Sequence, residues 1–189
     1  MIILISNPAP VKDEIEIIGQ LFNEGLEIFH LRKKEFQEDE MRKFIDGIPQ
    51  KFLERIVIHS HHHLAAEYGL KGIQVPAVYA GEVPAGTLSV SFHSPEEIRK
   101  SGLPFDYCFL SPVFDSISKE GYKSRFNPDE LKLFLKDRKE IIIALGGMDE
   151  DKTEAVKDLG FSGIALLGAV WQSGHPVGKF KQIRERWLK

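Results

Sequence analysis

Two residues of this sequence, a histidine and an arginine, have the chemistry needed to move a proton on an anionic ligand. His93 lies between an apolar run and the segment Ser94-Pro95-Glu96-Glu97, which has the composition of a helix start. Histidine is the side chain whose ordinary pKa best suits proton transfer near neutral pH. Arg32 follows another apolar run, where a guanidinium can bind a phosphate or a carboxylate. These residues predict an acid–base group and an anion clamp; a helix-capping histidine and an exposed basic run are the alternatives.

Glycine-containing loops predict a phosphate site. Gly146 and Gly147 follow one apolar run, and Leu167 and Gly168 end another. Glycine lets the backbone approach a ligand closely, and backbone N–H groups at a helix start bind phosphate. The pattern predicts a phosphorylated ligand without saying which ester.

A third group of polar residues combines hydroxyls with a lysine. Ser111, Ser116, Ser118 and Lys119 follow the run at 106–110, and hydroxyls together with an ammonium can bind phosphate. Residues 59–63 contain four histidines, whose side chains fan out if they begin a helix. We therefore interpret that segment as a polar helix start with one inward histidine, although histidine-rich segments also occur in metal sites.

The elements that must position these residues are short apolar or β-branched runs, each followed by a polar stretch that can form a helix. The runs are residues 2–5, 28–31, 56–59, 72–75, 87–91, 106–110, 141–145 and 163–167. Eight such units predict an α/β fold, a compact (β/α)8 TIM barrel that occupies residues 1–189 as a single domain. The loop at 76–86 is rich in proline and glycine, so the helix between strands four and five should be short or missing. An open Rossmann-like sheet is the structural alternative, but no G-x-G-x-x-G turn follows a strand.

The charge balance and the cysteine content restrict the partners. The chain has 25 basic and 28 acidic residues, a net charge of −3, and a single cysteine, Cys108. This balance gives no indication of a nucleic acid or a membrane as partner. One cysteine suits a reducing, cytoplasmic location. Barrels of this size often pair, which makes a homodimer a reasonable expectation.

Taken together, several motifs resemble the thiamine phosphate synthase and thiazole tautomerase superfamily across nearly the whole chain. They are Phe29-His30-Leu31-Arg32-Lys33-Lys34, Ser89-Val90-Ser91-Phe92-His93-Ser94, Ser111-Pro112-Val113-Phe114, Ile143-Ala144-Leu145-Gly146-Gly147-Met148 and Gly163-Ile164-Ala165. The resemblance implies a (β/α)8 barrel that binds a thiazole phosphate. By alternation along the strand, His30 and Arg32 should both point inward toward the mouth.

The synthase branch couples a thiazole phosphate to a pyrimidine diphosphate with the aid of magnesium. The resemblance matches Arg32 and Lys34 to its diphosphate-binding pair, Ser116, Ser118 and Lys119 to a Thr-x-Thr-Lys stretch, and Gly146, Gly147 and Gly168 to its phosphate loops. Its Asn-Asp pair corresponds to His59-Ser60 here, its second aspartate to Tyr79, and its strand-four histidine to Gln74. Both magnesium carboxylates are therefore replaced, and imidazole, hydroxyl and phenol groups are poor ligands for this ion.

The tautomerase branch needs no metal, and its histidine motif matches Ser91-Phe92-His93-Ser94. The resemblance favours a thiazole phosphate carboxylate tautomerase in which His93 moves the proton and Arg32 pairs with the carboxylate. No cofactor is then required, and magnesium enters only in the synthase alternative, with ligands from Asp115 or residues 59–63. Candidate substrate-binding residues are His30, Lys34, His59, Gln74, Ser91, Ser111, Ser116, Ser118 and Lys119, and candidate phosphate-binding residues are Gly146, Gly147, Leu167 and Gly168. A barrel that binds a thiamin precursor without catalysis is the third hypothesis.

Overall fold

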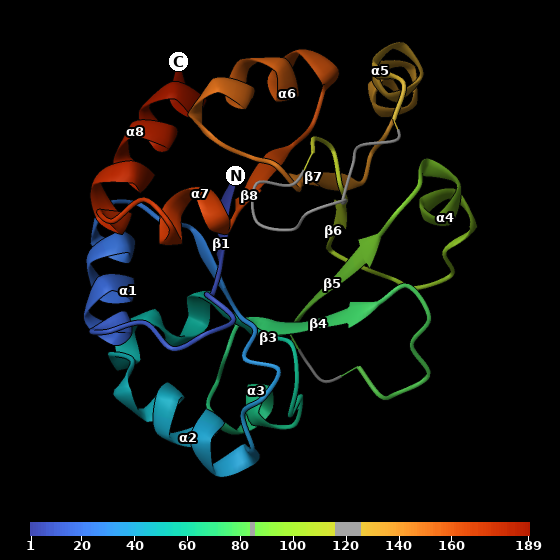
Figure 1. The fold of residues 1–189 in the computed structure, drawn as a ribbon. Helices are drawn as coiled ribbons and strands as arrows, with labels where there is room; N and C mark the ends of the chain where they lie inside the picture. Colours follow the sequence, from blue (N-terminus) through green and yellow to red (C-terminus); the bar gives the residue numbers. More distant parts are fainter. Residues whose placement is uncertain (84–85, 116–125) are drawn as a thin grey trace.

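Eight parallel strands close into a barrel in sequence order, and the helices surround it (Figure 1). We describe a computed structural model, which covers residues 1–83, 86–115 and 126–189. The last strand pairs with the first, so Leu166 lies beside Leu4 and no strand edge remains open. Closure confirms the predicted (β/α)8 barrel and excludes the open Rossmann-like sheet.

All eight predicted strands are present, with ends that differ from the expected ones by one residue at most. They are β1 Ile2–Ile5, β2 Ile28–Leu31, β3 Ile56–Ile58, β4 Gly72–Pro76, β5 Thr87–Phe92, β6 Tyr107–Leu110, β7 Ile141–Leu145 and β8 Gly163–Leu166. His59 and Leu167, predicted as the last strand residues, lie just beyond β3 and β8 and begin the loops of the mouth.

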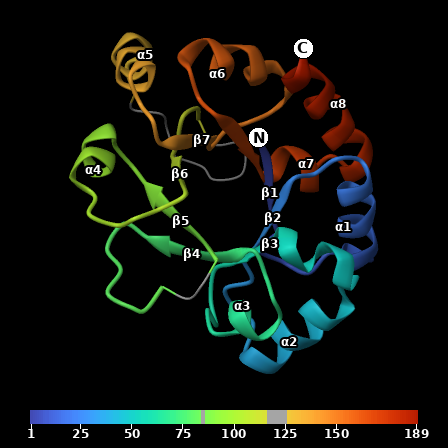
Figure 2. The same cartoon turned by 180° about the vertical axis from the view of Figure 1, so that it is seen from behind.

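The helices are uneven in length, as a chain of this size requires. They are α1 Glu14–Asn23, α2 Glu38–Gly47, α3 Leu64–Glu67, α4 Pro95–Lys100, α5 Pro128–Lys136, α6 Thr153–Leu159, α7 Gly168–Trp171 and α8 Pro176–Leu188, with 3-10 helices η1 Gln50–Arg55 and η2 Glu150–Lys152. In the described part of the connection between β4 and β5 there is no helix, as the sequence predicted, and Figure 2 shows this side of the barrel as a loop. No described helix is long and apolar enough to cross a membrane.

The core has two layers. One lies inside the barrel and contains Ile3, Ile28, Val57, Tyr107, Phe109, Ile143 and Ala165. The larger layer lies between the strands and the helices, and it includes Phe29, Leu31, Ile58, Phe180 and Ile183. Adjacent residues of β2 thus face different layers, which explains why the strands are apolar along almost their whole length.

The prediction that residues 61–63 begin a helix is wrong. Helix α3 starts at Leu64, and His61 has a φ of 51° in the turn before it. The turn closes through a hydrogen bond from the Leu64 N–H to the His61 carbonyl. The histidine-rich segment is therefore a loop at the mouth, followed by a single helical turn.

Candidate active site

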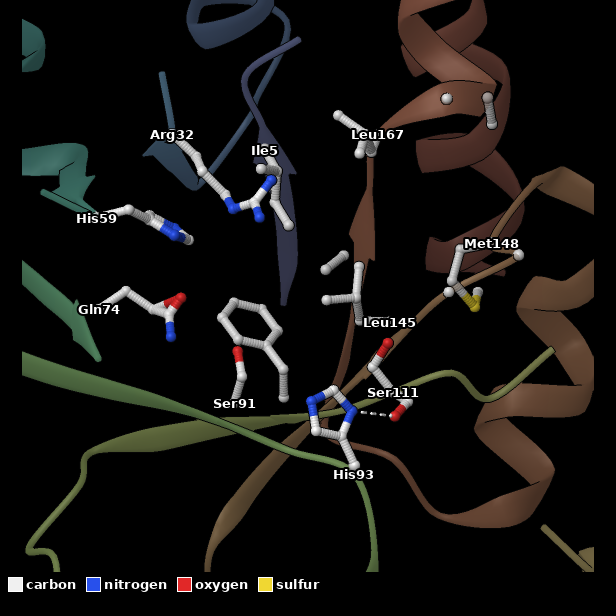
Figure 3. A pocket seen from close by; sticks show the side chains of 16 residues that line it. Ile5, Arg32, His59, Gln74, Ser91, His93, Ser111, Leu145, Met148 and Leu167 are labelled. Carbon is white, nitrogen blue, oxygen red and sulfur yellow. Dashed lines mark hydrogen bonds between the residues drawn. The ribbon is translucent and has the colours of Figure 1, made fainter. Parts of the chain in front are cut away.

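A cavity of about 360 Å³ opens at the carboxyl ends of the strands (Figure 3). Side chains from opposite sides of the barrel enter it: Arg32, His59 and Gln74 from the side of β2 to β4, and Met148 and Leu167 from the side of β7 and β8. The full lining is Ile5, Arg32, His59, Gln74, Ser91, His93, Phe109, Ser111, Leu145, Gly146, Gly147, Met148, Ala165, Leu167, Gly168 and Ala169. The cavity therefore brings together ten of the residues selected from the sequence.

His93 is held by the start of the helix that follows it. The Ser94 side chain accepts a hydrogen bond from the Glu97 N–H, and the Glu97 carboxylate accepts one from the His93 N–H at 2.8 Å. His93 Nδ1 lies 3.0 Å from the Ser111 carbonyl oxygen (Figure 3). A carbonyl can only accept, so Nδ1 carries a proton, and it is Nε2 that has the lone pair in the neutral imidazole. Within the described part of the chain, His93 Nε2 has no hydrogen-bond partner, and the side chain lies at the edge of the cavity.

Arg32 supplies a positive charge that has no partner in the described part of the chain. Its guanidinium makes no hydrogen bond or ion pair with any residue that the structure describes, whereas its backbone N–H donates to Ser6 Oγ at 2.8 Å. Partial burial lowers the pKa of the Arg32 guanidinium without removing its charge, since arginine stays protonated in proteins. A half-buried guanidinium without a carboxylate partner is suited to bind an anionic ligand.

The loop that carries Arg32 is anchored by a buried ion pair that the sequence analysis did not identify. Lys33 Nζ lies 2.7 Å from Glu14 Oε2, and the two side chains are 0% and 5% exposed. The same ammonium donates to the carbonyl oxygens of Asn7 and Ala9. Burial raises the pKa of the Glu14 carboxyl, against the lowering effect of Lys33. Lys33 thereby joins the loops that follow β1 and β2.

Two glycines shape the opposite wall. Gly146 and Gly147 have φ values of 95° and 66°, which favour glycine, and a Cβ on Gly147 would lie 2.3 Å from the Asp115 carbonyl oxygen. The Val113 N–H donates to the Leu145 carbonyl, which holds the loops after β6 and β7 together. Gly168 and Ala169 begin α7, where the first N–H groups have no partner within the helix. These backbone groups line the cavity as the predicted phosphate loops would.

His30 does not reach the mouth, which corrects the expectation that it points there beside Arg32. Its side chain is 0% exposed in the barrel interior, and burial lowers its pKa to about 3. His30 Nδ1 lies 2.9 Å from His59 Nε2, and it is His59 that lines the cavity. Alternation along β2 correctly predicted that His30 faces the barrel interior. It could not predict that the side chain lies below the cavity, beneath His59.

The remaining predicted residues lie apart from the main cavity or outside the described residues. Lys34 is exposed and lines a second, smaller cavity of about 350 Å³, which shares Arg32, His59, Gln74 and Ser91 with the first. Ser116, Ser118 and Lys119 lie outside the residues that the structure describes. The mouth thus has two adjoining lobes with Arg32 between them.

Sequence reasoning missed the apolar part of the wall. Phe109, Leu145 and Met148 line the cavity, and Trp171 Nε1 donates at 2.7 Å to the carbonyl of Ile5, which is another lining residue. A search for polar residues after strands passes over such side chains. The position of Trp171 four residues after Leu167 could have suggested it, because residues at this spacing share a helix face.

The closed barrel, with Arg32 and the glycine loops after β7 and β8 at its mouth, defines a (β/α)8 protein whose candidate site lies at the carboxyl ends of the strands. Comparison with known proteins identifies the family. The model of the thiamine monophosphate synthase family matches residues 2–170, and the chain belongs to this family. This confirms the resemblance found in the sequence.

Relatives and solved structures agree with the family. A thiamine phosphate pyrophosphorylase from Bacteroides thetaiotaomicron has 32% identity and a TM-score of 0.85, with 98% of this chain and 96% of that chain covered. A thiamine-phosphate synthase of Anoxybacillus flavithermus is 23% identical over 94% of this chain and 88% of its own length. One from Vibrio campbellii is 30% identical, but the match covers only 54% of this chain and 52% of that relative.

The described residues of the mouth do not suit the magnesium ion that the synthase branch uses. Magnesium prefers carboxylate oxygens, yet no aspartate or glutamate is among the described residues that line the main cavity. Among residues 1–83, 86–115 and 126–189, no group of three or more His, Cys, Asp or Glu side chains could hold a metal ion. The sequence resemblance implies the same, since it matches the synthase's magnesium-binding positions to His59, Ser60 and Tyr79.

Proposed function

We propose that this chain is an enzyme of thiamin biosynthesis that binds a thiazole phosphate carboxylate and catalyses its tautomerisation without a metal. The observation that carries the proposal is the geometry of His93, whose Nδ1–H donates to the Ser111 carbonyl and whose Nε2 is left free as a base. In a tautomerisation a proton leaves one position of the ring and another returns elsewhere, so no atom is gained or lost. A positioned histidine is sufficient for such a step.

The rest of the cavity supports the binding part of this proposal. The backbone N–H groups around Gly147 and Gly168 would hold the phosphate, and the apolar side chains of Leu145 and Met148 would contact the ring. Arg32 would pair with the carboxylate, because its guanidinium has no other partner among the described residues. Ser91 and Gln74 lie between these groups and would contribute neutral polar contacts.

The second candidate is the thiamine phosphate synthase reaction, and the names of the relatives favour it over the tautomerase. In that reaction the smaller lobe beside Arg32 and Lys34 would take a pyrimidine diphosphate. The synthase candidate requires magnesium ligands that the described residues of the mouth do not supply. The synthase candidate therefore depends on magnesium ligands from outside the described part of the mouth. The tautomerase candidate uses side chains and backbone groups that already line the cavity.

The test is turnover of the carboxylated thiazole phosphate by purified protein in the presence of a chelator. We expect wild type to aromatise the substrate, and His93→Ala to lower kcat by about 10²- to 10⁴-fold, the usual contribution of a general acid–base group. The matched control is His175→Ala, which removes an exposed histidine before α8, remote from the cavity lining. It should keep the wild-type kcat.

Two outcomes would contradict the proposal. Full activity of His93→Ala would remove His93 from the mechanism. If wild type leaves this substrate unchanged but joins the pyrimidine diphosphate to thiazole phosphate with magnesium, the protein is a synthase.

A further inference from the structure

A chain of three polar side chains runs from the buried barrel interior to the cavity. Tyr107 Oη lies 2.6 Å from His30 Nε2, and His30 Nδ1 lies 2.9 Å from His59 Nε2. Tyr107 and His30 are 2% and 0% exposed, whereas His59 lines both lobes of the mouth. The catalytic scheme proposed above assigns no role to His30 or Tyr107.

All three side chains are held in their neutral forms. Burial lowers the pKa of His30 to about 3, and burial together with the nearby His30, Arg32 and His62 lowers the pKa of His59 well below its usual value. Burial raises the pKa of the Tyr107 hydroxyl. Each imidazole therefore carries one proton and offers one lone pair, so the direction of one hydrogen bond fixes the direction of the next.

The chemistry of the two groups favours one direction. A phenol O–H is a stronger donor than a neutral imidazole N–H, and an imidazole nitrogen is a stronger acceptor than a phenol oxygen. Tyr107 is therefore the favoured donor and His30 Nε2 the acceptor, at 2.6 Å. His30 then carries its proton on Nδ1 and donates it to His59 Nε2 at 2.9 Å, an ordinary N–H donor distance. The proton of His59 must consequently be on Nδ1.

The Nδ1–H of His59 has no hydrogen-bond partner within the described part of the chain. Arg32 lines the same two lobes as His59, and its guanidinium also lacks a partner there. Figure 3 shows both side chains entering the cavity from the same side. Two groups that can only donate thus lie together, away from the glycine loops of the opposite wall.

We propose that His59 Nδ1–H and the Arg32 guanidinium form a donor-only subsite for a carboxylate of the ligand, and that His30 and Tyr107 fix His59 as the donor. A carboxylate accepts through both oxygens and donates nothing, so it satisfies both groups. A His59 with its proton on Nε2 would instead present a lone pair to the carboxylate. His30 and Tyr107 are positioning residues for this specificity. The identity of the ligand rests on the proposed function, whereas the tautomer of His59 does not.

The first test measures the tautomer of His59 directly. Two-bond ¹H–¹⁵N correlation spectra of wild-type protein should show the Nδ1–H form of His59, with no titration between pH 6 and 8. Tyr107→Phe removes only the hydroxyl, and His59 should then become a mixture of the two neutral forms. A wild-type His59 protonated on Nε2, or one that is cationic at pH 7, would overturn the proposal.

The second test compares the affinity for the carboxylated thiazole phosphate with that for the same ligand lacking the carboxylate. His59→Phe should lower the preference for the carboxylated form about 10-fold or more, the usual effect of one hydrogen bond to a charged group. His59→Gln, which keeps an N–H donor, should restore part of the preference. An unchanged preference in His59→Phe would overturn the proposal.

The carboxylate subsite can be tested even if the proposed function is wrong. If wild type binds neither thiazole, acetate replaces them as the probe, with chloride at equal ionic strength as the control. Acetate alone should shift the ¹⁵N signals of His59 Nδ1 and Arg32 Nε, and Arg32→Met should abolish the shift at His59. If acetate shifts neither signal, there is no carboxylate subsite.

Discussion

His30 illustrates, at the scale of one residue, how burial changes what an imidazole can do. The same residue type is exposed at the edge of the cavity in His93, where we propose that it acts as a base, and is a neutral, fully buried hydrogen-bonding group in His30. Because the pKa of His30 falls to about 3, its ring stays neutral at every pH at which the protein is expected to work. His30 is therefore unsuited to proton transfer, although it lies on the same strand that leads to Arg32 at the mouth.

The stability of the protein should depend on pH through His30 and His59. Their folded-state pKa values are lowered, so below about pH 6.5 the unfolded chain binds protons that the folded chain does not, and for His30 this difference persists down to about pH 3. Stability is therefore present above pH 6.5 and falls on acidification, by up to about 1.4 kcal/mol per pH unit for each group. Urea unfolding of wild type and His30→Gln between pH 6.5 and 5 measures this dependence. The variant should show the smaller slope.

The control for this prediction is His175→Gln, which replaces an exposed histidine outside the core. It should keep the wild-type slope. An equal slope in His30→Gln and wild type would mean that His30 is charged when folded.

At the scale of elements, the site depends on loops that are fastened to each other. Lys33 joins the loops after β1 and β2, and the hydrogen bond between Val113 and Leu145 joins those after β6 and β7. Loops fastened in this way hold Arg32 and Gly147 on opposite walls of the cavity. Changes in these contacts should therefore affect stability and ligand binding together.

Breaking the buried ion pair should be costly. Lys33→Met leaves the Glu14 carboxylate buried without a counter-charge, and such losses usually destabilise by about 3–5 kcal/mol. The exposed Lys100–Glu96 pair is the matched control, since Lys100→Met should change stability by about 0.5 kcal/mol or less. Denaturant unfolding of both variants checks the prediction. Similar small losses in the two would show that the buried pair contributes little.

Alanine at Gly147 should destabilise the protein and weaken phosphate binding. The added Cβ would meet the Asp115 carbonyl oxygen at 2.3 Å and would also sit at a φ of 66°. Gly69→Ala has a nearly equal φ of 62° and no atom within 4 Å, so it measures the conformational cost alone. That cost is about 1 kcal/mol or more, and Gly147→Ala should exceed it clearly.

Thermal unfolding with and without inorganic phosphate separates the two effects. Phosphate should stabilise wild type and Gly69→Ala but not Gly147→Ala. Equal stabilisation of all three proteins would place the phosphate elsewhere.

At the scale of the whole molecule, closure between β1 and β8 makes the site. The Ile164 N–H donates to the Met1 carbonyl at 3.0 Å, and Trp171 of α7 donates to the end of β1. This seam brings Ile5 and Leu167, which are far apart in the sequence, to the same cavity. The chain positions the glycine loops after β7 and β8 and Arg32 relative to each other only when the barrel is closed.

Gly163→Ala tests this seam. A Cβ at Gly163 would lie 2.5 Å from the Met1 carbonyl oxygen and 2.8 Å from Ile143 Cδ1, so β1 must move. We expect a loss of about 1–3 kcal/mol, the usual cost of overpacking, in a single unfolding transition. Gly102→Ala, which has no atom within 4 Å, should change stability by about 0.5 kcal/mol or less. A loss of stability no larger than that of Gly102→Ala would mean that the contact between β1 and β8 adjusts to the added methyl group.

The sequence by itself determined the barrel, its eight strands and the part of the site that follows their ends. Local signals are enough for this. Apolar runs mark the strands, Ser94 caps α4 as predicted, Asn127 caps α5, and Gly160 ends α6 in the left-handed conformation. Because parallel strands end at one rim, residues after different strands had to meet.

Only the tertiary structure decided the depth and the partners of the side chains. It placed His30 below the cavity, separated the buried Lys33 from the exposed Lys34, and joined Tyr107 to His59 through His30. Alternation along a strand gives the face that a side chain occupies. Burial, protonation and hydrogen-bond partners depend on residues brought together from other strands, which sequence spacing does not encode.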